Sequence, residues 1–378
     1  MLFYLAFIII AAACSTITIK TLIGYSDIKY VYKVIIGVVV SFGWFGILIL
    51  RLLKVTPYLN TGFYSVASNL LYTLMGFMFI LFIILMMRDI IWYLIFYSLK
   101  LFRIDAWYLD PRNLSILNIA NLIVVVIALC VSFYASYEGN KLPDIVKETI
   151  ESSKISRNLR IVQVSDLHIT RATSNNKIIK LINTINSQNP DVIVLTGDVI
   201  DDNIDNIKDK IDLLSNLSAP YGIYTIMGNH EFYNDVYSFK KVIENIGIKF
   251  LFNGGIHLAN SNIYLSGIPD FSTMFERINL WRSIQNSQKS DFKILLSHQP
   301  VIINSLNKDL YDLVLSGHTH GGQIFPMHLF AKKANEFLAG KYKVNNIDLI
   351  VSRGAGAWGP QMRLFAPSDI IVIDLLKK

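Results

Sequence analysis

The sequence predicts a fold of two parts, in which an N-terminal bundle of about four membrane-spanning helices precedes a C-terminal α/β domain. Three observations predict it. More than half of the 378 residues are hydrophobic and only 17% are charged, which is too apolar for a soluble globular protein. The long uncharged stretches all lie in the first third of the chain. From residue 159 onward, short β-branched runs alternate with polar segments of helical periodicity.

Four stretches of residues 1–137 are long enough to cross a hydrocarbon core about 30 Å thick, since each has about 17 to 22 residues without a charge. They are Leu2–Ile19, Val34–Leu50, Val66–Met87 and Ile116–Phe133. The first, with alanines at positions 11–13 before Cys14, also has features of a cleaved secretory signal peptide. It lacks a basic segment at its start and three further spans follow, which favours a membrane span.

A further apolar stretch follows the third predicted span, beyond Arg88 and Asp89. It runs from Ile90 to Phe102, is rich in aromatic residues and ends among basic residues. This pattern is typical of a helix that lies in the membrane interface. The same residues could equally lengthen the third span or belong to a pair of membrane-embedded helices. The sequence fits both alternatives.

The basic residues near the spans favour an extracytoplasmic C-terminal domain in a multi-pass protein of the cell membrane. Four spans place this domain on the same side as Met1. Seven basic residues flank the spans on the other side and five on this side, and positive loops tend to stay in the cytoplasm. The seven are Lys20, Lys29, Lys33, Arg88, Lys100, Arg103 and Arg112, and the five are Arg51, Lys54, Lys141, Lys147 and Lys154.

The net charge of +7 comes mainly from the membrane region. Nine basic and four acidic residues precede Glu138, whereas 26 basic and 24 acidic residues follow from Glu138 onward. A C-terminal part so nearly neutral argues against nucleic-acid binding, which usually needs a strong basic patch. Both cysteines, Cys14 and Cys130, fall inside predicted spans. The C-terminal part therefore has no disulfide framework and no thiolate metal site.

The segment 138–158 separates the two parts. It begins Glu-Gly-Asn, contains Pro143 and carries mixed charges, which predicts a polar linker or a short surface helix. Beyond it we expect buried strands that alternate with helices, and hence sheets flanked by helices. The expected strands are Leu159–Val164, Val192–Leu195, Ile223–Met227, Ile263–Ser266, Ile294–Ser297, Leu313–Ser316, Leu349–Ser352 and Ile370–Ile373, and the helices are Lys177–Ser187, Ile207–Leu217 and Tyr237–Ile246.

Polar residues gather where these strands end, which is the edge at which α/β sheets collect their ligands. Taken alone, each residue has an ordinary explanation such as a turn, a helix cap or a core histidine. Five of the seven histidines share such positions, however, and together the pattern predicts a metal site. The residues are Asp166 and His168, Asp198, Asn229 and His230, His298, and His318 and His320.

These residue types fit one kind of chemistry. Carboxylate, imidazole and amide oxygen suit divalent Mn, Fe or Zn. A carboxylate can bridge two ions through its two oxygens, so a central aspartate between two ligand groups would build a dinuclear site. Two ions about 3.5 to 4 Å apart lower the pKa of a bridging water and clamp both ends of an in-line displacement at phosphorus. The pattern therefore predicts hydrolysis of a phosphoester by a metal-bridging hydroxide.

Five motif blocks, taken together, resemble the motif set of the calcineurin-like metallophosphoesterase superfamily, in the expected order. The blocks are Asp166-x-His168, Gly197-Asp198, Gly228-Asn229-His230-Glu231, His298 and Gly317-His318-Thr319-His320. The resemblance covers residues 159–378 and not the membrane region. It implies a metallophosphoesterase fold, a β-sandwich flanked by helices, for this domain.

The resemblance also implies roles for single residues. His230 would not bind metal; it would stabilise the transition state or protonate the leaving oxygen, which suits an imidazole that titrates near neutrality. The implied ligands are Asp166, His168 and His320 for the first metal, Asn229, His298 and His318 for the second, and Asp198 as the bridge between them. All of these motif positions are present.

Two later segments are similar to a bacterial subgroup whose members are exported or membrane-tethered and include phosphodiesterases and enzymes of nucleotide-linked lipids. They are Gly321–Gln323 and the glycine-rich run Arg353–Pro360 with Arg363. Arg363 is then a candidate phosphate clamp, and the alternative is a surface arginine beside a turn. Glu231 could orient His230 or simply begin a helix.

The sequence thus predicts a membrane-anchored hydrolase of phosphodiesters or pyrophosphates. Tethering favours a lipid-linked substrate, because it raises the effective concentration of the enzyme at the bilayer. One alternative is a membrane sensor or scaffold with a regulatory metal site, which would show degraded ligands or lack His230. Another is a metal hydrolase of amides or thioesters, which the ligand order disfavours. His257 and His328 belong to no motif and are expected to be structural or surface residues.

Overall fold

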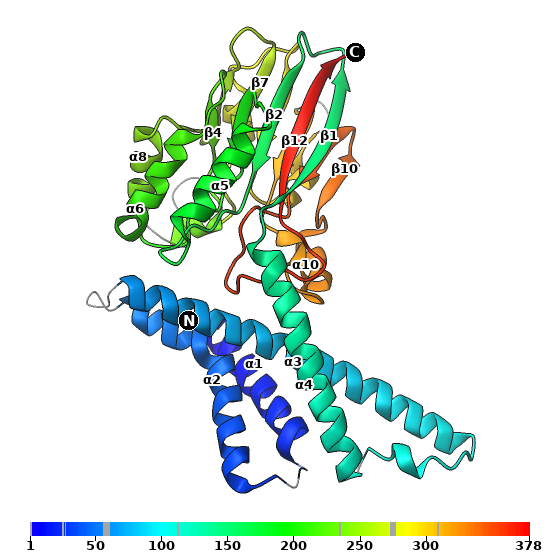
Figure 1. Ribbon diagram of the computed structural model, residues 1–378. Coiled ribbons are helices and arrows are strands. Elements are labelled where there is room, and N and C mark those ends of the chain that lie inside the picture. The colour runs from blue at the N-terminus through cyan, green and yellow to red at the C-terminus, as the bar shows by residue number, and fades with distance from the viewer. Residues whose placement is uncertain are drawn as a thin grey trace. The chain divides into compact units, whose positions relative to one another are not determined.

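The computed structural model of this protein describes residues 2–24, 26, 28–55, 61–111, 113–233, 236–272, 277–307 and 310–378. It divides into two compact units, a helical unit of Met1–Tyr137 with Gly359–Met362 and a catalytic unit of Glu138–Trp358 with Arg363–Lys378 (Figure 1). Arg112, one of the basic residues used for the topology prediction, lies outside the described residues, as do the side chains of Arg51 and Lys54.

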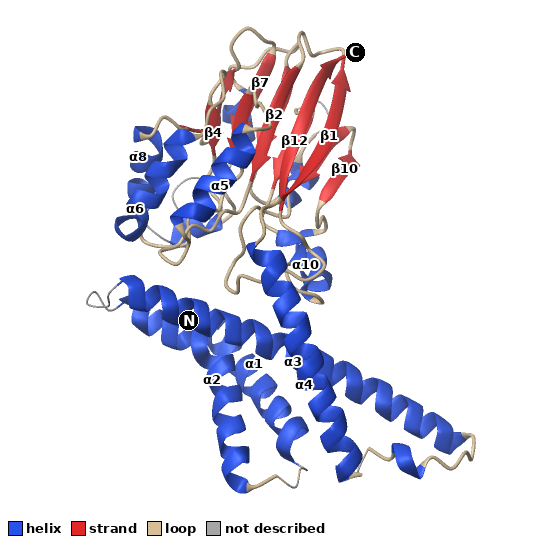
Figure 2. Ribbon diagram, in the orientation of Figure 1, coloured by secondary structure: helices blue, strands red, loops and turns tan. Residues whose placement is uncertain are grey.

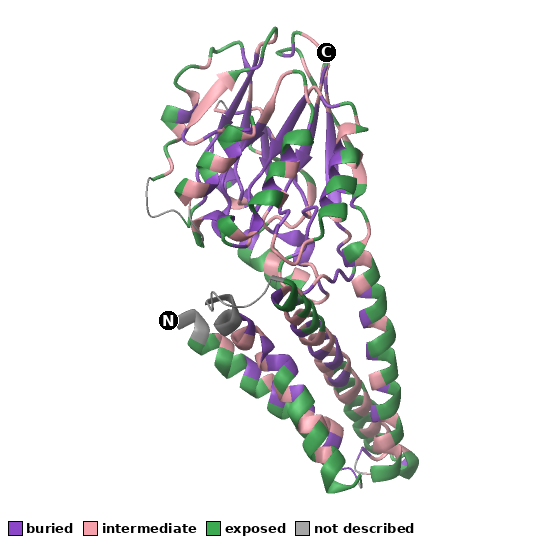
Figure 3. Ribbon diagram, turned by 60° about the vertical axis from the view of Figure 1, so that its left-hand side comes forward, coloured by how far each residue is buried: buried purple, intermediate pink, exposed green. Residues whose placement is uncertain are grey.

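The helical unit contains the four apolar helices that the sequence predicts. They are α1 (Leu2–Ile19, continued by the π-helical turn Lys20–Gly24), α2 (Tyr30–Val55), α3 (Thr61–Leu101) and α4 (Leu114–Asn140), with a short 3-10 turn at Trp107–Leu109. Among the described residues, four stretches are long and apolar enough to cross a membrane: Leu5–Gly24, Tyr30–Leu50, Gly62–Leu101 and Leu114–Asn140. Many of their large apolar side chains are exposed, as expected of helices that lipid surrounds (Figure 3).

Helix α3 runs without a break through Arg88 and Asp89, so the stretch from Ile90 lengthens the third helix and does not form a separate interfacial helix. Both charged side chains have partners nearby. The Arg88 Nε lies 2.7 Å from the Asp89 Oδ1, and its Nη1 donates to Asn121 Oδ1 of α4 at 2.7 Å. Because these partners lie on the same helix and on α4, the helix can continue past two charged residues.

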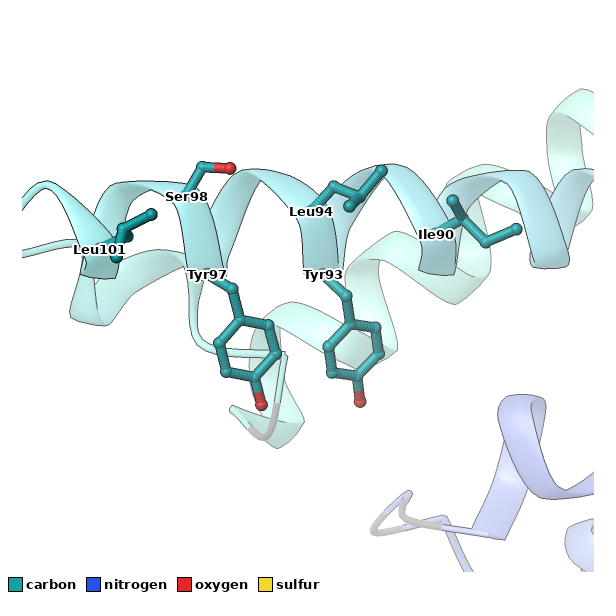
Figure 4. A pocket seen from close by; sticks show the side chains of 6 residues that line it. All are labelled: Ile90, Tyr93, Leu94, Tyr97, Ser98 and Leu101. Atoms are coloured by element: carbon teal, nitrogen blue, oxygen red, sulfur yellow. The ribbon is translucent and has the colours of Figure 1, made fainter.

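The extended part of α3 carries a shallow surface hollow of about 440 Å³. Figure 4 shows that one helix supplies the whole lining, with Tyr93 and Tyr97 side by side and their ring centroids 6.2 Å apart. The lining residues are Ile90, Tyr93, Leu94, Tyr97, Ser98 and Leu101. An apolar face of this kind, built by a single helix, suits contact with lipid.

The catalytic unit is a sandwich of two six-stranded sheets, in the orders β1-β12-β2-β3-β4-β5 and β10-β11-β9-β8-β7-β6 (Figure 2). The strands are β1 (Asp144–Ser152), β2 (Leu159–Val164), β3 (Val192–Leu195), β4 (Ile223–Thr225), β5 (Lys249–Phe250), β6 (Gly254–His257), β7 (Ile263–Gly267), β8 (Phe292–Leu296), β9 (Leu313–Ser316), β10 (Gly340–Val344), β11 (Ile347–Val351) and β12 (Asp369–Lys377).

Alternate residues along the strands build separate cores. Ile161 and Val194 of the first sheet pack with Leu265 and other residues of the second sheet between the two layers. Their neighbours, such as Val162, face outward and pack under helices. The helices are α5 (Asn175–Asn186), α6 (Ile204–Asp212, followed by a 3-10 turn at Leu213–Asn216), α7 (Asn229–Tyr233), α8 (Val236–Asn245), α9 (Leu280–Ile284) and α10 (Met327–Asn335), with 3-10 turns at Pro300–Ser305 and His320–Gly322. The predicted α/β sandwich is confirmed.

The segment 138–158 differs from the predicted linker or short surface helix. It contains the nine-residue strand β1, which pairs in parallel with β12 from Asp144 opposite Asp369 to Ser152 opposite Lys377. The strand is polar because it lies at the edge of its sheet and is mostly half-buried or exposed. Its pairing partner is more than 200 residues away in the chain, so no local pattern indicates it.

Candidate metal centre

The polar residues predicted at the strand ends lie in loops that the sandwich brings together. β2, β3 and β4 are parallel neighbours in one sheet, and β7, β8 and β9 are parallel neighbours in the other. Their carboxyl ends carry the candidate residues, which are Asp166 and His168 after β2, Asp198 after β3, Asn229 and His230 at the start of α7, His298 after β8, and His318 and His320 after β9. Both sheets therefore contribute to one site.

Asp166, His168 and His320 form the first cluster. Their ligand atoms all lie within 4.8 Å of one another. The Nε2 atoms of the two histidines are 3.0 Å apart, and the His320 Nε2 is 3.4 Å from Asp166 Oδ1. The backbone N–H of His318 donates to the Asp166 carboxylate, which fixes its orientation. Three possible metal-ligand atoms from two separate loops thus lie close together.

Asp198, His298 and His318 form the second cluster, again with ligand atoms within 4.8 Å of one another. The His298 Nδ1–H donates to the carbonyl of Thr196 at 2.8 Å. This bond fixes the ring, whose Nε2 then lies 3.2 Å from Asp198 Oδ2 and 3.3 Å from His318 Nδ1. Such a carbonyl partner on the far nitrogen is how metal-binding histidines are commonly oriented.

Asp198 lies between the two clusters. Its Oδ2 is 3.7 Å from the His168 Nε2 of the first cluster and 3.2 Å from the His298 Nε2 of the second. Its Oδ1 accepts a hydrogen bond from the backbone N–H of His230 at 2.9 Å. One carboxylate therefore faces histidines from both groups, while a backbone bond holds it in place.

The backbone of the site adopts a conformation that side chains rarely tolerate. Five of the clustered residues have positive φ angles, namely Asp166 (53°), His168 (47°), Asp198 (52°), His318 (71°) and His320 (51°). A left-handed backbone costs about 1 to 2 kcal/mol for each residue with a Cβ. Strain of this kind persists where the surrounding structure imposes it, and it is concentrated at functional sites.

Motif glycines allow the ligand loops to approach one another closely. A Cβ added to Gly228 would lie 2.2 Å from Asp198 Oδ1, and one added to Gly317 would lie 2.3 Å from Asp166 Oδ2. Both distances are far inside van der Waals contact, so any larger residue would displace a clustered carboxylate.

The pKa of His298 shifts in the opposite direction to that of the other clustered histidines. Burial lowers the pKa of His168, His318 and His320, which keeps these imidazoles neutral and thus in the form that binds metal. Burial also lowers the pKa of His298, but the carboxylates of Asp198, Asp166 and Asp270 together outweigh it and raise this pKa well above its usual value. The pKa of Asp198 is correspondingly low, because nearby histidines outweigh its burial. The Asp198 carboxylate thus stabilises a positive charge on His298.

The donor set fits divalent metal ions. Asn229 Oδ1 is buried and accepts no hydrogen bond within the described part of the chain. A buried amide oxygen without a partner is costly, and a cation would satisfy it. Imidazole, carboxylate and amide oxygen together are ligands for ions such as Mn, Fe or Zn. The residues present therefore suit the metals that the sequence predicts.

His230 lies beside both clusters and is oriented by a residue that the sequence analysis missed. Its Nδ1 lies 2.9 Å from Asp201 Oδ1 and its Nε2 lies 4.0 Å from Asp198 Oδ2. Burial lowers the pKa of His230, but the bond to Asp201 and the nearby carboxylates outweigh it and raise the pKa to about 8. Asp201 lies three residues after Asp198 in the same loop, and this spacing is the sequence signal that could have indicated its role.

Glu231 lies in the first turn of α7, as one of the two alternatives from the sequence expected, and its carboxylate bonds to backbone N–H groups of the neighbouring loops. It is fully buried, and its carboxylate accepts the backbone N–H groups of Gly228, Asp198 and Ile200 at 2.7 to 3.0 Å. Burial and the neighbouring Asp198 charge raise the pKa of Glu231 to about 7. Glu231 therefore fastens the loop after β4 to the loop that carries Asp198.

Arg363 has neither of the two roles that the sequence suggested, a phosphate clamp or a surface arginine. Only 1% of it is exposed. Its guanidinium donates to five backbone carbonyls, those of His320, Arg353, Gly354, Gly356 and Ala366. The guanidinium thus links the glycine-rich loop to the loop of His320 through hydrogen bonds. The sequence motif does not indicate this burial, because glycine-rich loops usually lie at the surface.

The two histidines outside the motifs belong to neither cluster. His257 contacts Asp291 through its Nε2 at 2.8 Å and packs against the ring of Tyr264. His328 stacks on Phe325, with ring centroids 5.1 Å apart.

Comparison with known proteins gives concordant results. The model of the calcineurin-like phosphoesterase family matches residues 159–322. A metallophosphoesterase of Campylobacter jejuni is 33% identical over 70% of this chain and 72% of its own length. One of Helicobacter pylori is 32% identical over 75% of this chain and 76% of its own. A zebrafish (Danio rerio) protein named as a transmembrane protein with a metallophosphoesterase domain is 28% identical over 67% of this chain and 62% of its own length.

Proposed function

This chain belongs to the calcineurin-like metallophosphoesterase family, and we propose that it uses two divalent metal ions to hydrolyse a phosphodiester or pyrophosphate bond in a lipid-linked substrate. It is a phosphoester hydrolase and a membrane protein. The observation that carries the dinuclear proposal is the position of Asp198, whose Oδ2 faces histidines of both clusters.

The ligand assignment follows the two clusters. Asp166, His168 and His320 would hold one ion, and Asn229, His298 and His318 the other, with Asp198 shared between them. When bound, two such ions supply a deprotonated water as nucleophile and neutralise the charge on the phosphoryl oxygens. The unpartnered Asn229 Oδ1 and the neutral imidazoles of the first cluster support this assignment.

The protein's own groups would then handle the leaving oxygen. His230 lies at the edge of both clusters, and Asp201 accepts its Nδ1–H, so its Nε2 points toward Asp198 and the reacting group. In this position a protonated His230 would donate the Nε2 proton to the leaving oxygen as the bond to phosphorus breaks. Asp201 is a positioning residue in this scheme, because it acts through His230.

We favour a lipid-linked substrate because the catalytic unit is joined closely to a membrane helix. α4 ends at Asn140 and β1 begins at Asp144, which leaves a connection too short for the domain to move far from the bilayer. The charge distribution near the helices supports an extracytoplasmic position for this unit. A reporter fused after Lys378 that is active only in the cytoplasm would contradict this orientation.

Hydrolysis of an aryl phosphodiester by the full-length protein in detergent, with added manganese, tests the reaction. We expect activity that chelation removes and manganese restores, and that Asp198→Ala abolishes. His257→Ala is the matched control, because this histidine is paired with Asp291 outside the site and should leave the rate unchanged. A folded protein that binds metal but hydrolyses no phosphoester with any divalent ion would overturn the proposal.

A second assay tests the lipid-linked substrate. The full-length protein in nanodiscs is given either a soluble phosphodiester or a lipid with the same phosphodiester headgroup in the same disc. We expect the larger kcat/KM for the lipid. Equal values for the two would count against a lipid-linked substrate and leave the phosphoesterase assignment intact.

A further inference from the structure

Helix α10 carries its large apolar side chains on the outside. Met327, Leu329 and Phe330 are all exposed, the last two by 60% and 63%, and the only buried residue of the helix is Asn335. A surface helix of a soluble domain normally turns its apolar face toward the core. In α10 this face has no covering within the described residues, and three apolar side chains within four positions form an exposed patch.

The patch continues onto the segment after Arg363. Phe365 is 78% exposed, and its ring lies 5.9 Å from that of Phe325, which in turn stacks on His328 at the start of α10. We name this surface, made of Met327, Leu329, Phe330 and Phe365, the α10 patch. It joins two segments of the catalytic unit that are separate in the sequence, so it is more than the face of one short helix.

The two segments that carry the α10 patch are both joined to the loop of His320. α10 follows the loop with His320 after only a few residues, and a Cβ added to Gly322 would lie 2.3 Å from the backbone of His328. Arg363 donates to the carbonyls of both His320 and Ala366, so the segment that carries Phe365 is hydrogen-bonded to the loop of His320. Figure 1 shows α10 within the catalytic unit, at the end of the strands.

The charges beside the patch are mostly positive. Lys332 and Lys333 occupy the last turns of α10, and both are exposed. Glu336 follows, and its carboxylate accepts a hydrogen bond from Asn304. Exposed aromatic and aliphatic side chains next to lysines are typical of a helix that lies in the interface of a membrane with anionic lipids.

We propose that the α10 patch docks on the surface of the bilayer, with Leu329, Phe330 and Phe365 among the lipids and the two lysines against anionic headgroups. The short connection after α4 tethers the unit to a membrane helix, which favours a bilayer as the occupant. The docking would hold the metal centre at the level of the headgroups. This inference deepens the proposed function, since it names the surface that presents lipid-borne phosphoesters to the site.

Fluorescence quenching in nanodiscs tests the docking with the full-length protein. Cys14 and Cys130 are replaced by alanine, and an environment-sensitive fluorophore is attached through Met327→Cys. The matched control carries the label through Trp281→Cys on α9, a side chain that is 73% exposed. The discs hold one chain each, in phosphatidylcholine and phosphatidylglycerol with a spin-labelled lipid as quencher. We expect severalfold stronger quenching at position 327 than at position 281.

A second variant separates docking from catalysis. Leu329→Glu with Phe330→Glu should abolish the excess quenching and leave hydrolysis of a soluble aryl phosphodiester unchanged, because neither side chain belongs to the metal centre. Inactive protein with strong quenching would count against the proposed function alone.

Three outcomes would overturn the docking. One is equal quenching at both positions. Another is a shielded label that lipid does not quench, which would show that the protein's own helices cover the patch. The third is shielding that requires two chains in one disc, which would identify a second copy as the occupant.

Discussion

The two ligand clusters present similar donors but are held by different parts of the molecule. The first cluster rests on Arg363, whose guanidinium binds the carbonyl of His320 and braces the loop beside Asp166. The second is held by hydrogen bonds near the strand ends. The carbonyl of Thr196 accepts the Nδ1–H of His298, and the carboxylate of Glu231 accepts the backbone N–H of Asp198. The difference teaches that two ligand clusters in one site can have separate supports. Each support can then be removed alone.

The largest effect is expected where the two clusters meet. Asp198→Ala removes the carboxylate that faces both, so we expect loss of activity and loss of at least one ion per chain. Metal content by mass spectrometry and hydrolysis of an aryl phosphodiester measure the two effects. If Asp198→Ala kept both ions and its rate, the clusters would not share this residue.

His230→Ala should break the chemistry without disturbing either cluster. We expect the rate to fall about 10²- to 10⁴-fold, the usual contribution of general acid catalysis. Metal content should stay the same, and a substrate with a more acidic leaving group should lose less. Asp201→Asn should show a smaller loss of the same kind, since it weakens the support of His230. A uniform loss for all leaving groups would argue against proton donation.

Arg363→Lys should weaken only the first cluster. A lysine cannot reach five carbonyls, so the loop under His320 loosens, and we expect affinity for one of the two ions to fall about 10- to 100-fold. A titration with a competing chelator resolves the two affinities. Arg353→Lys is the control in the same loop, because its guanidinium pairs with Asp369. Equal weakening of both ions would contradict separate supports.

Glu231→Gln should have the smallest effect and act on the second cluster. The substitution places an NH₂ donor against backbone N–H groups that the carboxylate now accepts, at a cost of about 2 kcal/mol. Thermal unfolding in detergent, followed by intrinsic fluorescence, should show a lower midpoint. Glu244→Gln on α8 is the control, since that carboxylate is half-exposed and pairs only loosely with Lys240. An identical unfolding midpoint for Glu231→Gln and the unmodified protein would show that the Glu231 hydrogen bonds do not stabilise the fold.

The sequence predicts the interior of the sandwich and misses its edges. All eight predicted strands are interior strands, whereas β1, β5, β6 and β10 are the four edge strands of the two sheets. The sequences of interior strands are continuous apolar runs because both faces of these strands are covered. Edge strands are half-exposed and polar, and β1 finds its partner only through the fold. Hydrophobic patterns therefore predict the layers and not their borders.

The site shows the same division between local and distant information. The strand-end aspartates and histidines follow from the sequence because each one directly follows an apolar run. The burial of Arg363 does not, since its five carbonyl partners come from three separate positions along the chain that only the fold joins. The continuation of α3 through Arg88 depends likewise on Asn121 of another helix.

The measurement that tests the shared Asp198 most directly is electron paramagnetic resonance of the full-length protein titrated with manganese. The account predicts that, as the second ion binds, the signal of isolated manganese gives way to that of an exchange-coupled pair, and that Asp198→Ala never shows the coupled signal. A spectrum of isolated ions at every loading of the unmodified protein would contradict a dinuclear centre.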